Sequence, residues 1–569
     1  MKQRTLLNLG RYFDRPQAQW QLLSSRIDQL LSTQSSFFSI ELEEPLETLA
    51  QRYAAQLIAS RSTSVDDKVT FETVDIASLE LVRPRRVGIE QLALHAVKQL
   101  TLDDKLKSLG FNQQQLAASI GNIIARMAAP ASELATYHWL QSQSGLGELI
   151  DYDFEGMGLD RLYQGSDLLW KHREAIETHL YSQERDLFSF SETITLYDLT
   201  NTFFEGEAKS NPKAQRGRSK EKRTDCPLVT LGLVLDGSGF PRKSQIFPGN
   251  ASEPETLQLI LQGLEGRSGS TVILDAGIAS EENIQYLIEH DYHYLVVSRK
   301  RKRHFDEDQS IVIKDIPGQT VKVQKVTVEE TGEVELYCHS QLREKKEQAI
   351  QDNFSQKYEA ALNKLHSGLS QKGAIKKHEK IIERLGRLKE KYARAAQHYD
   401  VSVIVDDEGD KALSISWERM EKANSQATHP GVYCLRTNLT DWNEEALWRT
   451  YTMLTDLEAV FRSLKSELGL RPIYHHKEER VSGHIFITLI AYHLVQTLRY
   501  QLKAEKINDS WQTIRRKMEN QQRVTVILQR EDGKTIHLRK VTKAEPQQVV
   551  IYQALGISAF PGGVKKTLV

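Results

Sequence analysis

The stretches ITLYDLTNTFFEG (residues 194–206) and TVILDAGIASEEN (residues 271–283) decide the fold of this chain. The first begins with alternating polar and apolar residues that lead to Asp198, the pattern of a half-buried strand with an acid at its end. The second opens on a continuous apolar run closed by Asp275 and Gly277, which is typical of a central strand that feeds a loop. Open α/β sheets bind their ligands at such strand ends, so both acids are candidate site residues.

The surrounding segments complete an α/β pattern across residues 190–298. Strand-like runs come first, and helix-like runs then alternate with further strands. The DGSG turn at residues 236–239 is typical of an antiparallel hairpin. The expected order is three strands, then helix, strand, helix and strand, at residues 194–198, 227–236, 240–247, 253–266, 271–275, 280–290 and 292–298. This order predicts a mixed sheet flanked by helices.

A third acid, Glu458, lies far along the chain in YTMLTDLEAVFRSLKSELGLRP (residues 451–472), where we expect one long helix over residues 441–468. Spacings of three, four and seven residues place four side chains on one face of that helix: Tyr451, Leu454, Glu458 and Lys465. Hard divalent cations prefer carboxylate oxygens, and two carboxylates with a bridging third can hold a metal pair about 3.5–4 Å apart. Two aspartates and a distant glutamate therefore suit a two-metal phosphoryl-transfer site.

Together these motifs resemble the DDE transposases of bacterial insertion sequences, in the group named for its Tyr-Arg-Glu-Lys motif. Leu454 stands where that motif has its arginine, and Arg462, one turn after Glu458, is the candidate to replace it. The resemblance runs in the family's order through LYDLTNTFFEG, GRSKEKRTDCPLVTLGLVLDGSGFP, FPGNASEPETL, LDAGIASEENIQYL and RSLKSELGLRPIYHHKEERVSGHIFITLIAYHL.

The resemblance implies a ribonuclease-H-like catalytic core in which Asp198, Asp275 and Glu458 are catalytic and hold two Mg²⁺ or Mn²⁺ ions. It also implies double-stranded DNA as the partner, both the terminal inverted repeats of the element and the target DNA, with a homodimer acting in the DNA complex. The enzyme would cut the element ends, directly or through a hairpin intermediate, and join them to target DNA. In related enzymes a tryptophan stacks on a flipped base; Trp417, Trp442 and Trp448 are candidates, with core packing as the alternative.

Basic clusters flank the three acids, although the formal net charge of the chain is −1. Clusters of this kind are electrostatic footprints for phosphate, and the alternative for each is a solvated loop. One cluster lies at residues 299–303, a second at 213–223, and a third, with His475 and Arg480, follows Glu458. The candidate DNA contacts are Tyr451, Arg462, Lys465, Arg218, Lys220, Lys222, Arg223, Arg299, Lys300, Arg301, Lys302 and Arg303.

At 569 residues the chain is too long for one core, so we expect several domains. Residues 1–185 are expected to be a mostly helical region that binds element ends, with a dimerisation bundle as the alternative. The core would comprise 186–299 and 431–505, separated by an insertion at 300–430 that holds strands and then a charged helical hairpin. Residues 506–569 would form a C-terminal region with a β-hairpin over RVTVILQR-EDGK-TIHLRKV, for dimerisation or DNA contact.

Composition favours an ordinary globular protein, with 40% hydrophobic and 27% charged residues. Its three cysteines form no C-x-x-C pair, so neither a zinc knuckle nor a disulfide framework is expected. The first residues lack the apolar core of a signal peptide. The run HIFITLIAYHLV is shorter than a membrane span and predicts a core helix. We expect a cytoplasmic protein that uses neither a membrane nor a nucleotide cofactor.

Two other functions fit parts of this pattern. A sequence-specific DNA-binding protein of the same fold would not need the intact set of three acids. A ribonuclease-H-like nuclease without strand transfer would need neither the N-terminal helical region nor the insertion. The transposase hypothesis accounts for all three features.

Overall fold

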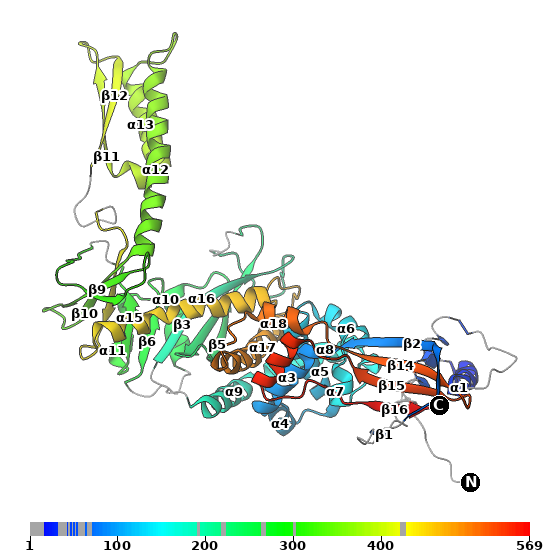
Figure 1. Ribbon diagram of the computed structural model, residues 1–569. Helices are drawn as coiled ribbons and strands as arrows, with labels where there is room; N and C mark the ends of the chain where they lie inside the picture. The colour runs from blue at the N-terminus through cyan, green and yellow to red at the C-terminus, as the bar shows by residue number, and fades with distance from the viewer. Residues whose placement is uncertain are drawn as a thin grey trace.

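The computed structural model describes residues 16–31, 42–43, 46–47, 49–51, 53–54, 63–64, 71–189, 194–217, 223–262, 269–299, 303–420 and 428–569. The molecule is an elongated body with an arm that rises from one end (Figure 1). A large sheet lies beside the base of the arm, helices fill the middle of the body, and a smaller sheet lies at the far end, near the chain termini.

The large sheet has nine strands in the order β5-β4-β3-β6-β7-β13-β10-β9-β8. Strands β3, β6 and β7 are parallel, and the other pairings are antiparallel, so the sheet is mixed. Helices flank it, which agrees with the predicted α/β class and with a ribonuclease-H-like domain. The strands are β3 (Ile194–Phe203), β4 (Leu228–Asp236), β5 (Pro241–Pro248), β6 (Thr271–Leu274), β7 (His293–Val297), β8 (Ile311–Lys314), β9 (Val321–Thr327), β10 (Val334–Ser340) and β13 (Val432–Thr437).

Both faces of the central strands are buried, as the apolar run of β6 predicts. Because side chains alternate along a strand, Tyr197 and Leu274 contact the helices α10 (Glu253–Leu261) and α11 (Glu281–Glu289) on one face. Leu196 and Ile273 belong to the main core on the other face. That second face is the one toward which α16 (Leu454–Arg462) packs, across β3.

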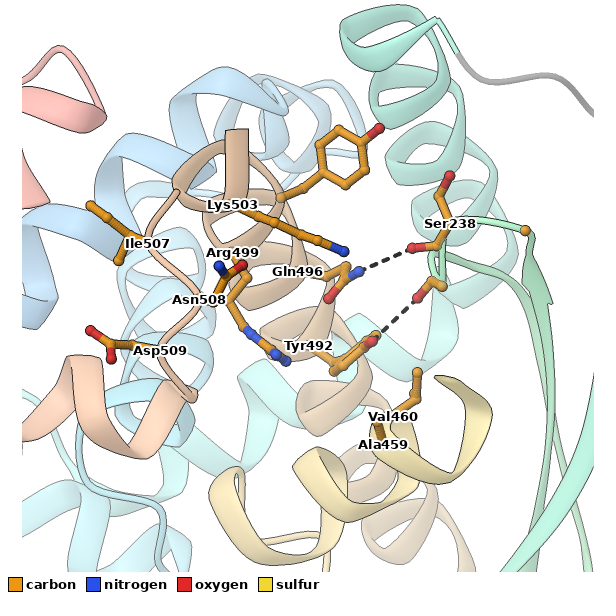
Figure 2. A pocket seen from close by; sticks show the side chains of 13 residues that line it. Ser238, Ala459, Val460, Tyr492, Gln496, Arg499, Lys503, Ile507, Asn508 and Asp509 are labelled. Carbon is orange, nitrogen blue, oxygen red and sulfur yellow. Dashed lines mark hydrogen bonds between the residues drawn. The ribbon is translucent and has the colours of Figure 1, made fainter. Parts of the chain in front are cut away.

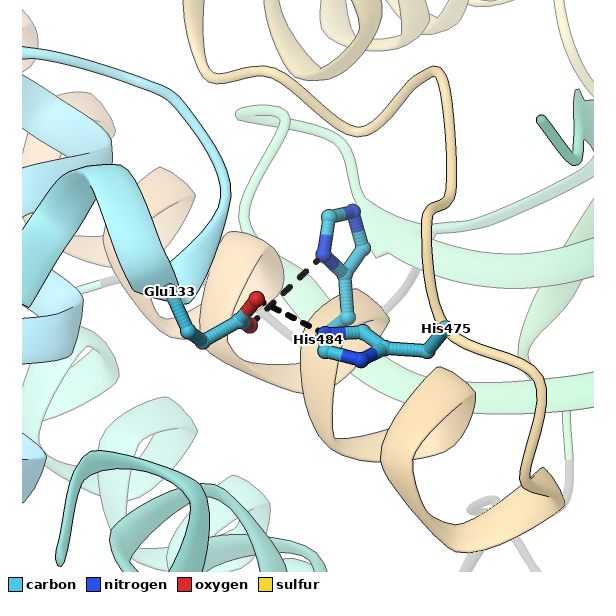
Figure 3. Close-up of side chains that lie close together, drawn as sticks. All are labelled: Glu133, His475 and His484. Atoms are coloured by element: carbon cyan, nitrogen blue, oxygen red, sulfur yellow. Dashed lines mark hydrogen bonds and ion pairs between the residues drawn. The ribbon is translucent and has the colours of Figure 1, made fainter. Parts of the chain in front are cut away.

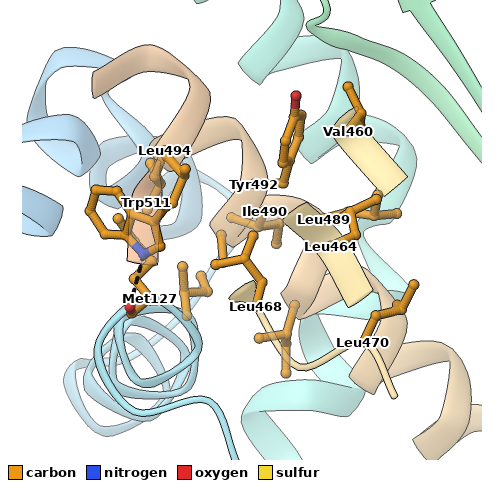
Figure 4. Close-up of a cluster of buried hydrophobic side chains, with 14 of the residues drawn as sticks. Met127, Val460, Leu464, Leu468, Leu470, Leu489, Ile490, Tyr492, Leu494 and Trp511 are labelled. Atoms are coloured by element: carbon orange, nitrogen blue, oxygen red, sulfur yellow. Dashed lines mark hydrogen bonds between the residues drawn. The ribbon is translucent and has the colours of Figure 1, made fainter. Parts of the chain in front are cut away.

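Helix α17 (Glu478–Ala504) is the centre of the main core, and it packs against the N-terminal helices α3, α5, α8 and α9. Figure 4 shows Leu489, Ile490 and Leu494 of this helix among side chains from several segments; Trp511 donates a hydrogen bond to the carbonyl of Met127 (2.9 Å). Among the described helices, α17 is long and apolar enough to cross a membrane, but 94% of its most apolar window is buried inside the protein. It is therefore a core helix, as predicted.

The helices α3, α5, α8 and α9 of the N-terminal region thus pack into one core with the later part of the chain. Helix α5 begins at a capping box in which Asn112 accepts from the Gln115 amide, and Ser132 caps α6 as its residue type predicts. Helices α8 and α9 follow one another directly and meet at His172. The helices are α1 (Gln17–Leu31), α3 (Gly88–Gln99), α4 (Leu102–Ser108), α5 (Gln113–Ala128), α6 (Glu133–Ser142), α7 (Leu146–Ile150), α8 (Leu159–Lys171) and α9 (Arg173–Phe188).

The smaller sheet joins the two ends of the chain, in the order β1-β16-β15-β14-β2. The predicted hairpin is present as β14 (Gln522–Arg530) and β15 (Thr535–Val541), and β2 (Val74–Arg86) pairs with β14. The remaining elements are β1 (Thr63–Ser64), β16 (Lys565–Leu568), α18 (Trp511–Met518) and α19 (Pro546–Ala554).

The arm consists of α12 (Gln341–Gly368), α13 (His378–Lys391), α14 (Ala393–Ala396), β11 (Tyr399–Val405) and β12 (Ala412–Arg419) (Figure 1). It has its own small core, which includes Tyr358, Leu362 and Ile381. The helical hairpin matches the prediction. The strands expected in the same insertion do not lie in the arm, because β10 pairs with β13 and extends the large sheet. The segment that projects is thus residues 341–420.

Buried Glu90 on α3 generates a prediction about stability. Its carboxylate accepts a hydrogen bond from the Ser144 hydroxyl (2.7 Å), and burial raises its pKa to about 7. The pKa of Glu90 is higher in the folded protein than in the unfolded chain. Its contribution to stability is therefore fully present at pH values below the pKa of the unfolded chain, and it is lost as pH rises through about 7. Glu90→Gln keeps an acceptor for Ser144 and does not ionise. We expect it to raise the free energy of unfolding at pH 8.5 by on the order of 2 kcal/mol and to change little at pH 5.

Thermal unfolding at the two pH values measures this difference. The exposed Glu330 in the turn before β10 offers a matched control, because Glu330→Gln removes the same charge from a solvated site. A Glu90→Gln melting midpoint equal to that of the wild type at pH 8.5 would contradict the assigned role of burial.

Candidate catalytic site

Asp198 and Asp275 are brought together by the register of two parallel strands. Tyr197 of β3 lies opposite Leu274 of β6 in the last paired position, and each aspartate is the next residue of its strand. Neighbouring strands lie about 4.8 Å apart. Because side chains alternate along a strand, both acids lie on the face of the sheet opposite to that of Tyr197 and Leu274. Each carboxylate also accepts a hydrogen bond from the amide of the following residue, at 2.7 Å.

Only one of the two acids ends its strand as predicted. Asp275 directly follows β6 and is exposed, whereas Asp198 is half-buried in the middle of β3. Strand β3 continues to Phe203 because its other edge remains paired with β4 as far as Leu228. Asp198 nevertheless lies one residue beyond the last position at which β3 pairs with β6.

Glu458 is exposed on α16, the helix that crosses β3. The single helix predicted over 441–468 is divided into α15 (Glu444–Thr452), α16 and the π-turn η2 (Ser463–Glu467), with the break at Met453. Tyr451 and Lys465 therefore lie on segments that adjoin the one with Leu454 and Glu458, and the backbone at Met453 keeps right-handed helical angles.

Tyr451 connects the acids electrostatically. Its phenol is half-buried, and burial, together with the negative charges of Asp275 and Glu458, raises its pKa to about 12. Charge effects of this kind weaken with distance, so Tyr451 lies in the same part of the molecule as both acids. Arg343, in the first turn of α12 at the base of the arm, acts on the same phenol in the opposite sense and stacks on Tyr433 at 4.8 Å. The sequence spacing did not predict that Arg343 lies near Tyr451. The pairing of β10 with β13 brings the start of α12, and with it Arg343, to this part of the sheet.

Several of the predicted DNA contacts have partners within the chain. The Arg299 guanidinium donates to the carbonyls of Ala276 and Gly277 (2.5 and 2.6 Å) and so holds the loop after Asp275. Arg303 pairs with Glu347 (3.2 Å), and Arg223 pairs with Asp225 (2.7 Å). Arg462 is exposed and Lys465 half-buried. The remaining candidates lie outside the described residues: Arg218, Lys220, Lys222, Lys300, Arg301 and Lys302.

The three candidate tryptophans all pack against neighbours. Trp448 donates to the Tyr433 hydroxyl (3.0 Å), Trp442 packs against the main core, and Trp417 packs against the core of the arm. These contacts favour the core-packing alternative for each residue.

A pocket of about 400 Å³ borders α16 at Ala459 and Val460, the two residues that follow Glu458 (Figure 2). Arg499 and Lys503, one turn apart on α17, line it. Gln496 and Tyr492 donate to the carbonyls of the β4–β5 turn, at 3.1 and 3.2 Å, and fix that turn against α17. The sequence signal for this pocket is the pair of cations that ends the apolar run of α17.

Another cluster of candidate metal ligands lies elsewhere in the described part of the chain. The ligand atoms of Glu133, His475 and His484 lie within 4.8 Å of one another (Figure 3). Arg126 donates to Nδ1 of His484 (2.8 Å) and to Glu133 (3.3 Å). Because this guanidinium uses the Nδ1 lone pair and adds a positive charge, the cluster suits a hydrogen-bond network rather than a cation.

The set of Asp198, Asp275 and Glu458 fits divalent ions better in its chemistry. All three donors are carboxylates, which Mg²⁺ and Mn²⁺ prefer, and both Asp275 and Glu458 are exposed. A large mixed sheet with acids at adjacent parallel strands and a third acid on a helix packed across β3 is consistent with the ribonuclease-H-like class of α/β domains.

Residues 191–494 match the model of the family described as the transposase DDE domain. The match spans just over half the chain and includes all three acids, so the protein belongs to this family. A search of curated proteins found no match. Members of the family are DNA transposases that use divalent metal ions.

Proposed function

We propose that this protein is the transposase of an insertion sequence, which cuts DNA at the ends of its element and joins the freed ends to target DNA. The observation that carries the proposal is the register that sets Asp198 beside Asp275 next to the helix of Glu458. These three carboxylates would hold two Mg²⁺ or Mn²⁺ ions. When bound, such ions activate the attacking oxygen and stabilise the leaving oxygen.

The neighbouring residues would position the DNA. Because its pKa is about 12, Tyr451 keeps its proton at neutral pH and can donate a hydrogen bond to a phosphate oxygen. Lys465 and Arg462 would add positive charge. Arg462 would take the role of the arginine in the Tyr-Arg-Glu-Lys motif, because this chain has Leu454 at the arginine's position. Arg299 would support Asp275 through the carbonyls it binds, in addition to any DNA contact.

The N-terminal helices and the arm are the proposed contacts to the element ends. Cleavage followed by strand transfer, directly or through a hairpin, distinguishes this function from its two alternatives. A DNA-binding protein would bind the ends without cutting, and a ribonuclease-H-like nuclease would cut without joining. We place the protein in the cytoplasm, where its DNA substrate lies in a bacterial cell.

The first prediction concerns the three acids. Asp198→Asn, Asp275→Asn and Glu458→Gln should each lower cleavage of element-end DNA in magnesium about a thousandfold or more, which corresponds to about 4 kcal/mol of barrier. Affinity for the DNA should change little, because each substitution removes a metal ligand rather than a DNA contact. The exposed Asp308→Asn and Glu330→Gln serve as controls. A variant that cuts at the wild-type rate would exclude its residue from the site.

The second prediction concerns the arm. Lys372, Lys376, Arg384 and Lys389 are exposed on it, and replacing all four with glutamine should weaken end binding at least tenfold. The slope of log affinity against log salt should also fall by about 0.9 for each phosphate that the variant no longer neutralises.

A matched variant on the same arm carries the opposite charge change. Asp407→Asn with Glu408→Gln neutralises the exposed turn between β11 and β12. It should leave affinity unchanged or raise it. Equal affinity and an equal salt slope for the two variants would remove the arm from the DNA interface.

The third prediction concerns assembly. We propose that two protein copies act on two paired element ends, each cutting one end, so that assembly precedes cleavage. The mass of the complex formed with end DNA in calcium, measured by light scattering, should equal two chains and two DNA duplexes. A complex of one chain and one end that completes strand transfer when magnesium is added would contradict this arrangement.

A further inference from the structure

The segment that follows the glutamate helix, residues 469–476, is bound to the strand that carries Asp198. The amide of Ile473 donates to the carbonyl of Phe203 (2.9 Å), and the amide of Glu205 donates back to Ile473 (2.8 Å). The hydroxyl of Thr202 donates to the carbonyl of Leu470 (3.2 Å). The segment thus connects the end of α16 and η2 to the end of β3, and it spans the two elements that hold Asp198 and Glu458.

The same segment is held from its other side by the N-terminal helices. His475 donates to Glu133 (2.7 Å), 342 residues away, and Arg126 donates to the carbonyl of Gly469 (3.4 Å). Gly469 has φ of +69°, and a Cβ atom there would lie 3.0 Å from that of Pro130. The chain therefore passes closely against the α5–α6 connection, at a position that favours glycine.

The polar groups at this junction form a buried network (Figure 3). Arg126 and Glu133 are each 4% exposed and His484 is 2% exposed. Since an arginine only donates, Nδ1 of His484 must accept, and its Nε2–H donates to Leu470 (3.3 Å). Burial and the charge of Arg126 lower the pKa of His484 to about 4, so it stays neutral.

Glu133 provides the negative charge of the network. Burial by itself would raise its pKa, but the hydrogen bond from His475 and the charge of Arg126 hold the pKa well below its usual range. The carboxylate thus remains ionised between two cationic or donor groups. Removal of that charge would leave the buried Arg126 without its counterion, which is costly in a site of this kind.

We propose that Arg126, Glu133 and His475 are positioning residues that couple the N-terminal helices to the catalytic carboxylates. They hold the 469–476 segment, and through it they fix the ends of β3 and of the glutamate helix. Because they act on the acids through this segment, their effect is on the rate of the chemical step and not on affinity for DNA. The cleavage measurement that tests this inference rests on the proposed transposase function, whereas the hydrogen-exchange measurement does not.

Glu133→Gln tests the coupling, because it keeps the shape of the side chain and an acceptor for Arg126 while removing the charge. We expect cleavage of bound end DNA to slow at least tenfold, with the Kd for that DNA within twofold of the wild type. Hydrogen exchange at the amides of residues 203–205, 470, 471 and 473–476 should accelerate at least tenfold. Asp167→Asn is the matched control, since it breaks another ion pair between α8 and α17 (Arg480, 2.9 Å) outside this segment.

Each result decides the inference. Slower cleavage with faster exchange in Glu133→Gln, and neither change in Asp167→Asn, supports it. Loss of affinity by the same factor as cleavage would assign Glu133 to DNA recognition and overturn the positioning role, as would unchanged exchange. If the wild type cuts no end DNA, the proposed function fails, while the exchange comparison still tests the coupling. If Glu133→Gln does not fold, His475→Asn breaks the same contact from the segment's side.

Discussion

The register between β3 and β6 is the constraint on which the site depends. It is fixed by apolar pairs, of which Tyr197 with Leu274 is the last, and it delivers two carboxylates to adjacent positions. A slip of one residue would turn every side chain of a strand to the opposite face, and Tyr197 and Leu274 would leave their core against α10 and α11. The hydrophobic effect that stabilises the sheet therefore also fixes the distance between the acids. Two like charges this close are costly without cations, which explains why such a pair belongs to a metal-dependent family.

The third acid depends on a different part of the molecule. Glu458 lies on a short helix that packs on β3 and continues into η2; η2 contacts α17, which is buried among helices from the first third of the chain. The helix of the candidate glutamate thus shares a core with residues more than 300 positions away, such as Met127, whose carbonyl accepts from Trp511. One continuous core joins the N-terminal helices to the sheet that carries Asp198 and Asp275, so a change in the packing of either part affects the other. A chain with separate domains joined by linkers would need another device to connect DNA binding with cleavage.

The sequence predicted local features well and long-range pairings poorly. The strand around Asp198, the apolar run before Asp275 and the helical hairpin after residue 340 are encoded in the periodicity of a few neighbouring residues, and the structure has all three elements. The break at Met453 was missed because the α15–α16 boundary carries neither glycine nor proline. The placement of β8–β10 in the large sheet follows from the pairing of β10 with β13, which are separated by the entire arm. Nothing in the sequence indicated the contact between Glu133 and His475, because that contact exists only in the folded chain.

The charges of the chain show why basic runs alone overstate a DNA interface. Arg303 and Arg223 lie in predicted phosphate-binding clusters, yet each pairs with a carboxylate of the chain. His475 and Arg480, from the cluster after Glu458, pair with Glu133 and Asp167. The net charge of the protein is −1. Basic side chains that pair with carboxylates of the same chain leave fewer basic side chains to bind phosphate. DNA affinity must then come from cations that face a cavity or solvent beside the acids, and Arg499 and Lys503 next to the glutamate helix have the placement that such a role requires.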